Sequence, residues 1–228
     1  MTAEVRFPAE VEMSAAEVRF PADGLRLILV RHGQTASNVR MALDSAPPGP
    51  PLTEEGRQQA ADFAQSLVDE PVVAVYASVA VRAQETAAPI AAAHELHVEV
   101  IDGVQEVYVG ELNNRSDHDS LRQFVAVFSA WAAGDLDSRM PGGENATEVI
   151  ERYDKVLRMI RERHFAGVVV LVSHGAAIRL VAPTLAPNVP MNLAEHTLLP
   201  NTGRVVFRDD PDSPTGWHCV EWTGVQLP

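Results

Sequence analysis

The stretch LRLILVRHGQT, residues 25–35, decides the fold class. Its first six residues are apolar except for Arg26, which is typical of a central strand covered on both faces. The strand stops at a basic residue, a histidine and a glycine, and Gly33 permits a close approach to the backbone. The stretch VSHG, residues 172–175, repeats this form after a second apolar run. Two strand ends that each present His-Gly indicate a binding site, because a histidine just past an apolar strand leaves a polar ring at the rim.

Strands alternate with helices along the rest of the chain. Thr53 precedes a helix with acidic residues in its first turn, and Asn145 with Glu148 three positions on can cap another. We predict further strands at residues 72–76, 97–101, 168–173, 205–208 and 218–222, and further helices at 81–95, 117–133 and 175–185. Repeated strand–helix crossovers imply an α/β three-layer sandwich with a mostly parallel central sheet and helices on both faces. The helix at 117–133 is a helical insertion over the site.

The N-terminal segment contains a repeat. The heptapeptide AEVRFPA occurs at residues 3–9 and again at 16–22. It is too short and too interrupted by proline for a solenoid unit. We expect residues 1–23 to be a duplicated, mobile leader, with a docking peptide as the alternative. Residues 24–228 then form one domain, in which residues 115–140 are the insertion.

Charge and composition exclude several classes of function. The 18 Lys and Arg residues against 31 Asp and Glu residues give a formal net charge of -13, the wrong sign for a nucleic-acid partner. The longest aliphatic run, residues 168–172, is far shorter than the roughly 20 residues that a membrane helix needs. The first 30 residues do not resemble a secretory signal, so we expect a cytoplasmic protein with no membrane association. Cys219 is the only cysteine, which excludes an internal disulfide and multi-cysteine metal sites.

Motifs for common cofactors are absent from the sequence. There is no glycine-rich dinucleotide fingerprint and no P-loop. The stretch HELH, residues 94–97, is one residue short of placing both histidines a full helical turn apart, as a metalloprotease requires. We therefore expect no cofactor and no metal.

From about Leu25 to its end the chain resembles the histidine phosphatase superfamily, in its phosphoglycerate-mutase-like branch. Ordered motifs carry this resemblance. They are RHGQT at 31–35 with Asn38, PLTEEGR at 51–57, Ser78 with Arg82, Glu106 with Gly110, PGGE at 141–144 and SHG at 173–175.

The resemblance implies that His32 is the nucleophile and becomes a phosphohistidine. A neutral imidazole is nucleophilic near pH 7 and needs no metal to act. By the same resemblance Arg31, Arg82 and the second catalytic histidine, His174, hold the phosphoryl oxygens, and Asn38 adds a neutral donor. Arginine suits this role because its planar donors bind phosphate oxygens bidentately and keep their charge.

Glu106 matches the proton donor of the family, which protonates the leaving alkoxide and must therefore hold a proton at the working pH. Mutases of the family carry an Arg-His-Tyr-Gly stretch and further basic residues after this glutamate, whereas residues 111–115 here read ELNNR. We therefore expect hydrolysis of a small phosphomonoester by a metal-independent enzyme, a monomer or homodimer. The alternatives are a cofactor-dependent mutase-like phosphotransferase and a noncatalytic phosphate-binding module on the same fold.

Aromatic residues of the insertion bear on the substrate. The predicted helix at 117–133 places on one apolar face Leu121, Phe124, Val125, Phe128 and Trp131. Its aromatic residues, Phe124, Phe128 and Trp131, are more often the core of such an insertion than ligand contacts. If one of them faces the pocket, an apolar leaving group is expected.

Overall fold

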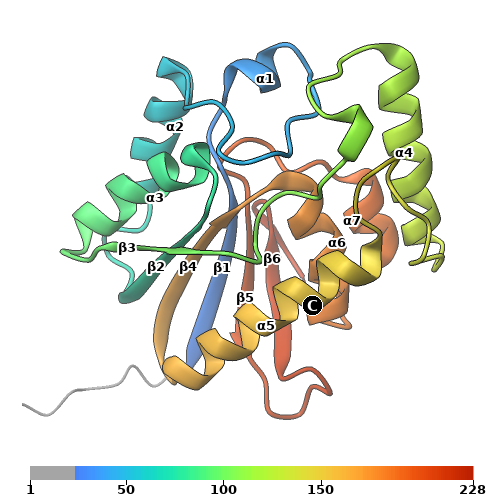
Figure 1. Ribbon diagram of the computed structural model, residues 1–228. Coiled ribbons are helices and arrows are strands. Elements are labelled where there is room, and N and C mark those ends of the chain that lie inside the picture. The colour runs from blue at the N-terminus through green and yellow to red at the C-terminus, as the bar shows by residue number, and fades with distance from the viewer. Residues whose placement is uncertain (1–23, 228) are drawn as a thin grey trace, which may run out of the picture.

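The computed structural model describes residues 24–227, so the expected leader at residues 1–23 lies outside the described residues. Within this part of the chain the strands form a seven-stranded sheet in the order β3-β2-β4-β1-β5-β6-β7 (Figure 1). The strands are β1 Leu25–Arg31, β2 Val72–Ser78, β3 Val98–Ile101, β4 Gly167–Ser173, β5 Arg204–Asp209, β6 Trp217–Trp222 and β7 Val225–Gln226.

Four strands make a parallel core, and the C-terminal strands extend it in antiparallel fashion. Strand β4 pairs in parallel with β1 and β2, and β2 pairs in parallel with β3. Strand β5 runs antiparallel to β1, and β6 and β7 continue that pattern. In the β1–β4 ladder Arg31 is opposite Ser173. The residues that follow, His32 and His174, therefore emerge side by side at one edge of the sheet.

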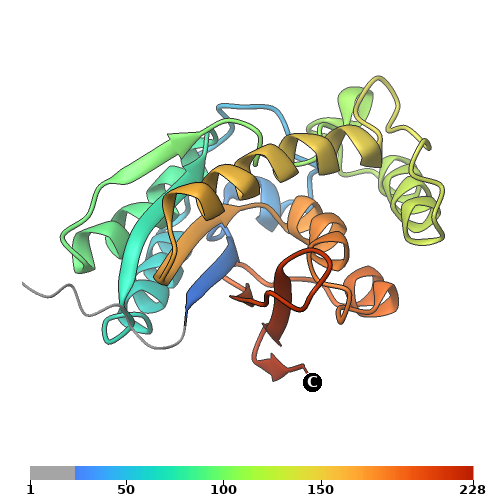
Figure 2. The same ribbon diagram turned by 90° about the horizontal axis from the view of Figure 1, so that it is seen from below.

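Helices cover both faces of the sheet, which confirms the predicted three-layer α/β sandwich. Figures 1 and 2 show α2 and α3 on one face and α5 on the other. Alternate side chains of β1 enter two cores: Leu27 and Leu29 pack on the side of α5 and α6, whereas Ile28 and Val30 pack on the side of α2 and α3. The helices are α1 Ala36–Val39, α2 Glu54–Gln65, α3 Val81–Ala93, α4 His118–Ala132, α5 Ala146–Arg163, α6 Gly175–Leu185 and α7 Met191–His196, with a 3₁₀ turn, η1, at Gly110–Leu112.

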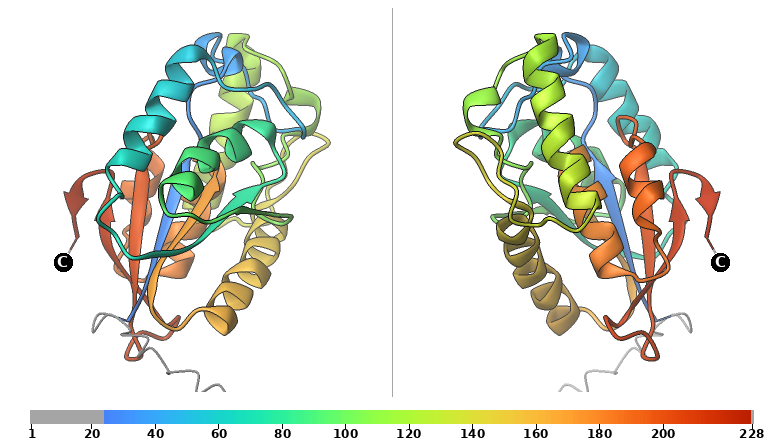
Figure 3. Two further views of the ribbon diagram at one scale, coloured as in Figure 1. Left: turned by 90° about the vertical axis from the view of Figure 1, so that its left-hand side faces the viewer. Right: turned by 90° about the vertical axis from the view of Figure 1, so that its right-hand side faces the viewer.

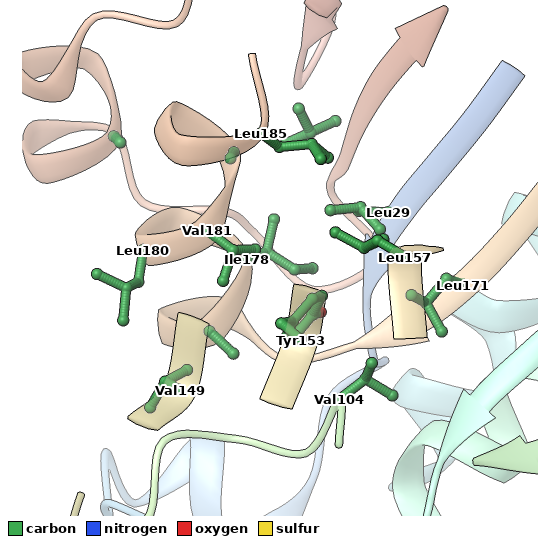
Figure 4. Close-up of a cluster of buried hydrophobic side chains, with 14 of the residues drawn as sticks. Leu29, Val104, Val149, Tyr153, Leu157, Leu171, Ile178, Leu180, Val181 and Leu185 are labelled. Atoms are coloured by element: carbon green, nitrogen blue, oxygen red, sulfur yellow. The ribbon is translucent and has the colours of Figure 1, made fainter. Parts of the chain in front are cut away.

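The larger core lies between the sheet and the helices α5 and α6. Figure 4 shows Tyr153 and Leu157 of α5 and Ile178 of α6 among the strand residues Leu29 and Leu171. All five side chains are almost completely buried. Burial of this apolar surface holds α6 against the end of β4, where the second His-Gly pair stands.

Helix starts follow the predicted caps. The Asn145 side chain accepts a hydrogen bond from the Glu148 amide, and the Glu148 side chain accepts one from the Asn145 amide, so the predicted capping box is formed. Thr53 caps α2 by accepting from the Gly56 amide at 3.0 Å. The short helices α1, η1 and α7 were not predicted, because segments of three to six residues show no periodicity.

Helix α4 occupies the middle of the predicted insertion. It stands at the same end of the molecule as α1, above the carboxyl ends of the parallel strands (Figures 1 and 3). Phe128 and Trp131 are buried, but Val125 is 57% exposed, although we predicted it on the apolar face. Val127 packs against the core in its place. Among residues 24–227, none of the helices combines the length and the apolar character needed to cross a membrane.

Candidate active site

A cavity of about 460 Å³ opens at the carboxyl ends of the parallel strands. Five of the six predicted site residues line it: Arg31, His32, Asn38, Arg82 and Glu106. The sixth, His174, is completely buried behind the wall, with its ring centroid 5.1 Å from that of His32. Residues distant in the sequence are thus brought together at the carboxyl ends of the parallel strands. Arg31 ends β1, and His32 and Asn38 follow it, whereas Arg82 follows β2, Glu106 follows β3 and His174 follows β4.

His32 presents a lone pair on Nε2. Its Nδ1 lies 2.7 Å from the Gly33 carbonyl oxygen, which can only accept, so Nδ1 carries the proton. Arg82 Nε donates to Nε2 at 3.1 Å. Burial, and then the charges of Arg82 and Arg31, hold the pKa of His32 well below its usual value of 6.5. The imidazole is therefore neutral near pH 7, with Nε2 as its nucleophilic nitrogen.

Close backbone packing fixes the loop that carries His32. A Cβ on Gly33 would lie 2.6 Å from the Gly56 carbonyl oxygen, and a Cβ on Gly56 would lie 2.1 Å from that of Gln34. The Gly33 amide also donates to Thr86 Oγ1 of α3 at 3.0 Å. The first turn of α2 therefore packs directly against the His32 loop, and only glycine fits at positions 33 and 56.

Buried nitrogen atoms without partners surround His32. Arg31 Nε, Arg82 Nη1 and His174 Nδ1 are buried and have no hydrogen-bond partner within residues 24–227. One Nη group of each guanidinium is held by the backbone: Arg31 Nη1 donates to the Leu199 carbonyl at 2.6 Å, and Arg82 Nη2 donates to that of Asp44 at 3.0 Å. Burial lowers the pKa of both arginines, against the charge of Glu106. Buried donors are costly without an acceptor, so this arrangement favours an anion with several oxygens.

Ser78 orients His174. Its hydroxyl accepts from the Ala80 amide at 3.2 Å and lies 2.7 Å from His174 Nε2. Since that ring nitrogen is the acceptor within reach of the hydroxyl proton, Ser78 donates to Nε2 and the ring proton sits on Nδ1. Burial lowers the pKa of His174 well below 6.5, and the nearby Arg82 lowers it further. His174 is therefore a neutral donor through Nδ1. Ser78 stands in one of the sequence motifs, but the motif did not predict this role.

Glu106 lies at the N-terminus of α6. Its Oε1 accepts from the amides of Val107 and Ala177, each at 2.9 Å, and its Oε2 accepts from the Ala176 amide at 3.2 Å. These bonds hold the carboxyl group at the cavity wall, on the side of α6.

Asn38 is engaged mainly in local structure. Its Oδ1 accepts from the Thr35 amide at 3.0 Å, forming a capping box at α1, and from Asn201 Nδ2 at 3.2 Å. Asn201 also donates to the His32 carbonyl at 3.1 Å. The amide oxygen of Asn38 is thus occupied, and the predicted role as a phosphate donor falls to its NH₂ group.

Sequence reasoning missed two charged residues that line the cavity. Asp44 precedes a Pro-rich loop, and Arg179 lies on α6. Arg179 Nε donates to the Ala194 carbonyl at 2.7 Å, and its guanidinium carbon lies 4.6 Å from the centroid of the Phe128 ring. Neither residue stands in a motif, so only their position in the fold marks them.

Several of the side chains that line the cavity are apolar. Phe124 lines the cavity, whereas Phe128 and Trp131 do not. One of the three insertion aromatics therefore faces the pocket, which meets the condition set for an apolar leaving group. Among residues 24–227, no three His, Cys, Asp or Glu side chains are grouped so as to hold a metal ion.

The chain is similar to known proteins. A family model described as histidine phosphatase superfamily (branch 1) matches residues 27–223. Phosphoserine phosphatase 1 of Hydrogenobacter thermophilus is 31% identical over 68% of this chain and 73% of its own length. A probable phosphoglycerate mutase, GpmB, of Yersinia pestis is 29% identical over 85% of this chain and 90% of its own.

A longer relative and a solved structure extend the comparison. The PE-PGRS family protein PE_PGRS11 of Mycobacterium tuberculosis is 30% identical to this chain over 87% of the chain's length. The chain covers only 36% of the length of that protein. The native structure of a mycobacterial glucosyl-3-phosphoglycerate phosphatase superposes with a TM-score of 0.74 at 23% identity, covering 89% of this chain and 100% of that one. At 23% identity this structural similarity shows a shared fold and no more.

Proposed function

The chain belongs to branch 1 of the histidine phosphatase superfamily, and from this premise we propose that it is a phosphatase that hydrolyses a small phosphomonoester through a phosphohistidine on His32. The observation that carries the proposal is the neutral Nε2 lone pair of His32 beside three buried, unpartnered nitrogen donors. A phosphoryl group supplies the acceptor oxygens that these donors lack. Phosphatases among the relatives, including phosphoserine phosphatase 1, support the same reaction class.

In the first step Arg82 Nε moves its hydrogen bond from His32 Nε2 to a phosphoryl oxygen, and the lone pair of Nε2 attacks phosphorus. An N–P bond forms, and the bond between phosphorus and the ester oxygen breaks. Arg31, Arg82 and His174 Nδ1 stabilise the charge on the phosphoryl oxygens. Glu106 donates its proton to the departing oxygen, so that an alcohol leaves instead of an alkoxide.

In the second step water hydrolyses the phosphohistidine. Glu106, now a carboxylate, takes a proton from the attacking water while an O–P bond forms and the N–P bond breaks. Inorganic phosphate leaves, and the electron pair returns to Nε2. All the charge stabilisation comes from protein side chains, so we propose that the reaction is metal-independent.

The decisive experiment is hydrolysis of p-nitrophenyl phosphate in excess chelator. We expect activity in the wild type and its loss in His32→Ala, while the matched control His97→Ala, an exposed histidine outside the cavity, keeps it. Rapid quenching with a ³²P-labelled ester should trap an acid-labile phosphohistidine at position 32. Full activity of His32→Ala would reject the proposal, and the trapped intermediate would exclude a noncatalytic phosphate-binding module.

The second candidate is a phosphoglycerate-mutase-like transferase, which the similarity to the probable mutase GpmB favours. In that case the phosphohistidine would survive long enough to rephosphorylate a second substrate. Isomerisation of 3-phosphoglycerate with a bisphosphate primer, faster than release of inorganic phosphate, would establish it. A cytoplasmic location, a monomeric or homodimeric state and a lid role for residues 115–140 stay predictions from the sequence.

A further inference from the structure

Asp44 is a buried carboxylate that the proposed mechanism does not use. Its side chain is 8% exposed and lines the same cavity as His32 and Arg82. Its Oδ1 lies 3.8 Å from Arg82 Nη1, which makes an ion pair but not a hydrogen bond. Its Oδ2 is buried and accepts no hydrogen bond from residues 24–227.

An ionised carboxylate only accepts hydrogen bonds, and a buried acceptor without a donor is unfavourable. Because Asp44 stands at the cavity wall, a bound molecule can bring the donor. The phosphoryl dianion cannot do so, because its oxygens are acceptors and repel the carboxylate. The donor must therefore come from the leaving group, close to the phosphate, since Asp44 neighbours Arg82.

The charges that line the cavity limit what else the leaving group carries. Arg31, Arg82 and Arg179 supply three positive charges. With Glu106 holding the proton that it transfers, these charges balance Asp44 and the two negative charges of the bound dianion. A second phosphate on the substrate would leave negative charge uncompensated in a buried space. A hydroxyl group adds no charge, and the positive charge of an ammonium group would lie against the Asp44 carboxylate.

Part of the remaining wall is apolar. Leu43, Val109, Phe124 and Leu199 line the same cavity as Asp44. Met41 and Leu198, both 72% exposed, line its mouth. These side chains favour a carbon skeleton between the donor group and the solvent.

We propose that Asp44 selects phosphomonoesters whose leaving group carries a hydrogen-bond donor, a hydroxyl or an ammonium, close to the ester oxygen on an otherwise apolar skeleton. The selection rests on the phosphatase function proposed above and names the substrate class of that site. Asp44 thereby acts on substrate choice as well as on the position of Arg82.

Three esters of one skeleton test this selection: propyl phosphate, 2-hydroxypropyl phosphate and 2-aminopropyl phosphate. We expect the wild-type kcat/KM to be about tenfold or more higher for the two donor-bearing esters, in line with a hydrogen bond to a charged group. Asp44→Ala should bring the ratio of each donor ester to propyl phosphate close to one. Asp44→Asn, which keeps an acceptor oxygen but no charge, should retain the preference for the hydroxyl ester and lose that for the ammonium ester.

The readout is the ratio between esters, so a general loss of activity does not mimic the effect. Asp119→Ala is the matched control, because Asp119 is an exposed carboxylate on α4, away from the cavity. An equal loss on all three esters in Asp44→Ala would show that Asp44 only positions Arg82, and would overturn the proposal. So would a wild-type enzyme without preference.

A second readout separates the subsite from the reaction. p-Nitrophenyl phosphate is assayed beside the three esters, and its failure to be hydrolysed would refute the phosphatase function. Calorimetric binding of the three esters then still tests the subsite: tighter binding of the donor-bearing esters, lost in Asp44→Ala, is expected. Equal binding of all three esters would overturn the selection. Thermal denaturation of each variant confirms that it is folded.

Discussion

Glu106→Gln separates the role of the carboxyl proton from that of the carboxyl shape. Glutamine has the same size but no acidic proton, so it cannot protonate a leaving alkoxide. For an alkyl phosphate we expect kcat to fall by about 10²–10⁴, the usual contribution of a general acid. For p-nitrophenyl phosphate we expect little change, because p-nitrophenolate leaves without protonation.

The same substitution has a structural cost that follows from the three amides that donate to Glu106. A glutamine oxygen can keep the bonds from Val107 and Ala177, but its NH₂ group then faces the Ala176 N–H. Leaving the Ala176 N–H without an acceptor lowers the free energy of unfolding by about 1–3 kcal/mol. At about 2–4 °C per kcal/mol for a domain of this size, the melting temperature falls by roughly 2–12 °C.

Steady-state kinetics on the two esters and differential scanning fluorimetry measure both effects. Glu111→Gln is the matched control, since Glu111 is exposed and does not line the cavity. Equal losses on the alkyl and p-nitrophenyl esters would refute Glu106 as the acid. An unchanged melting temperature would refute the account of its three hydrogen bonds.

Four further predictions concern the groups around the phosphoryl site. Arg82→Lys should lower kcat/KM for p-nitrophenyl phosphate by about 10²–10³, because one ammonium cannot replace the fork that contacts His32 and leaves Nη1 free for phosphate; near-normal kinetics would place Arg82 outside the reaction. Ser78→Ala should let the His174 proton move from Nδ1 to Nε2, which ¹⁵N NMR of the ring reports directly, and should lower kcat by about tenfold as one phosphate donor is lost; an unaltered ring spectrum would contradict the assignment. Because burial and the charges of Arg82 and Arg31 lower the pKa of His32 well below 6.5, the acidic limb of kcat/KM should lie well below pH 6.5 in a pH–rate profile. The unfolded chain takes up this proton below pH 6.5 and the folded chain does not, so stability should fall as the pH drops below 6.5; chemical denaturation at several pH values checks the sign.

The central strands could be predicted from the sequence alone, because a continuous apolar run indicates a strand that is buried on both faces. Strand β4 is buried along its whole length, and β1 is nearly so, which is what continuous aliphatic runs require. The two His-Gly pairs could be placed together because parallel strands end at the same edge of a sheet. In the β1–β4 ladder Arg31 pairs with Ser173, so the two His-Gly pairs that follow lie at the same level.

Other parts of the site could not be predicted from local pattern. Asp44 lies in an irregular loop, where no periodicity shows which side chains face inward. Arg179 sits on a helix whose other residues are mostly apolar, and its cavity position depends on how α6 packs against α7 and Phe128. Val125 was assigned to the wrong face of α4, because the apolar stripe there passes through Val127 instead. These positions depend on tertiary packing, which the local pattern of a single sequence does not predict.

Buried, unpaired donors explain how the cavity can hold a phosphoryl group. Arg31 Nε, Arg82 Nη1 and His174 Nδ1 have no hydrogen-bond partner within residues 24–227, and each such group lowers the stability of the ligand-free fold. A chain selected for stability alone would place apolar side chains at these positions. In exchange, charges and dipoles are already oriented when the substrate arrives, so the transferring group is stabilised without reorganisation of the protein. The closely packed three-layer sandwich, in which β1 and β4 pair in register, offsets the stability that is lost at these unpaired donors.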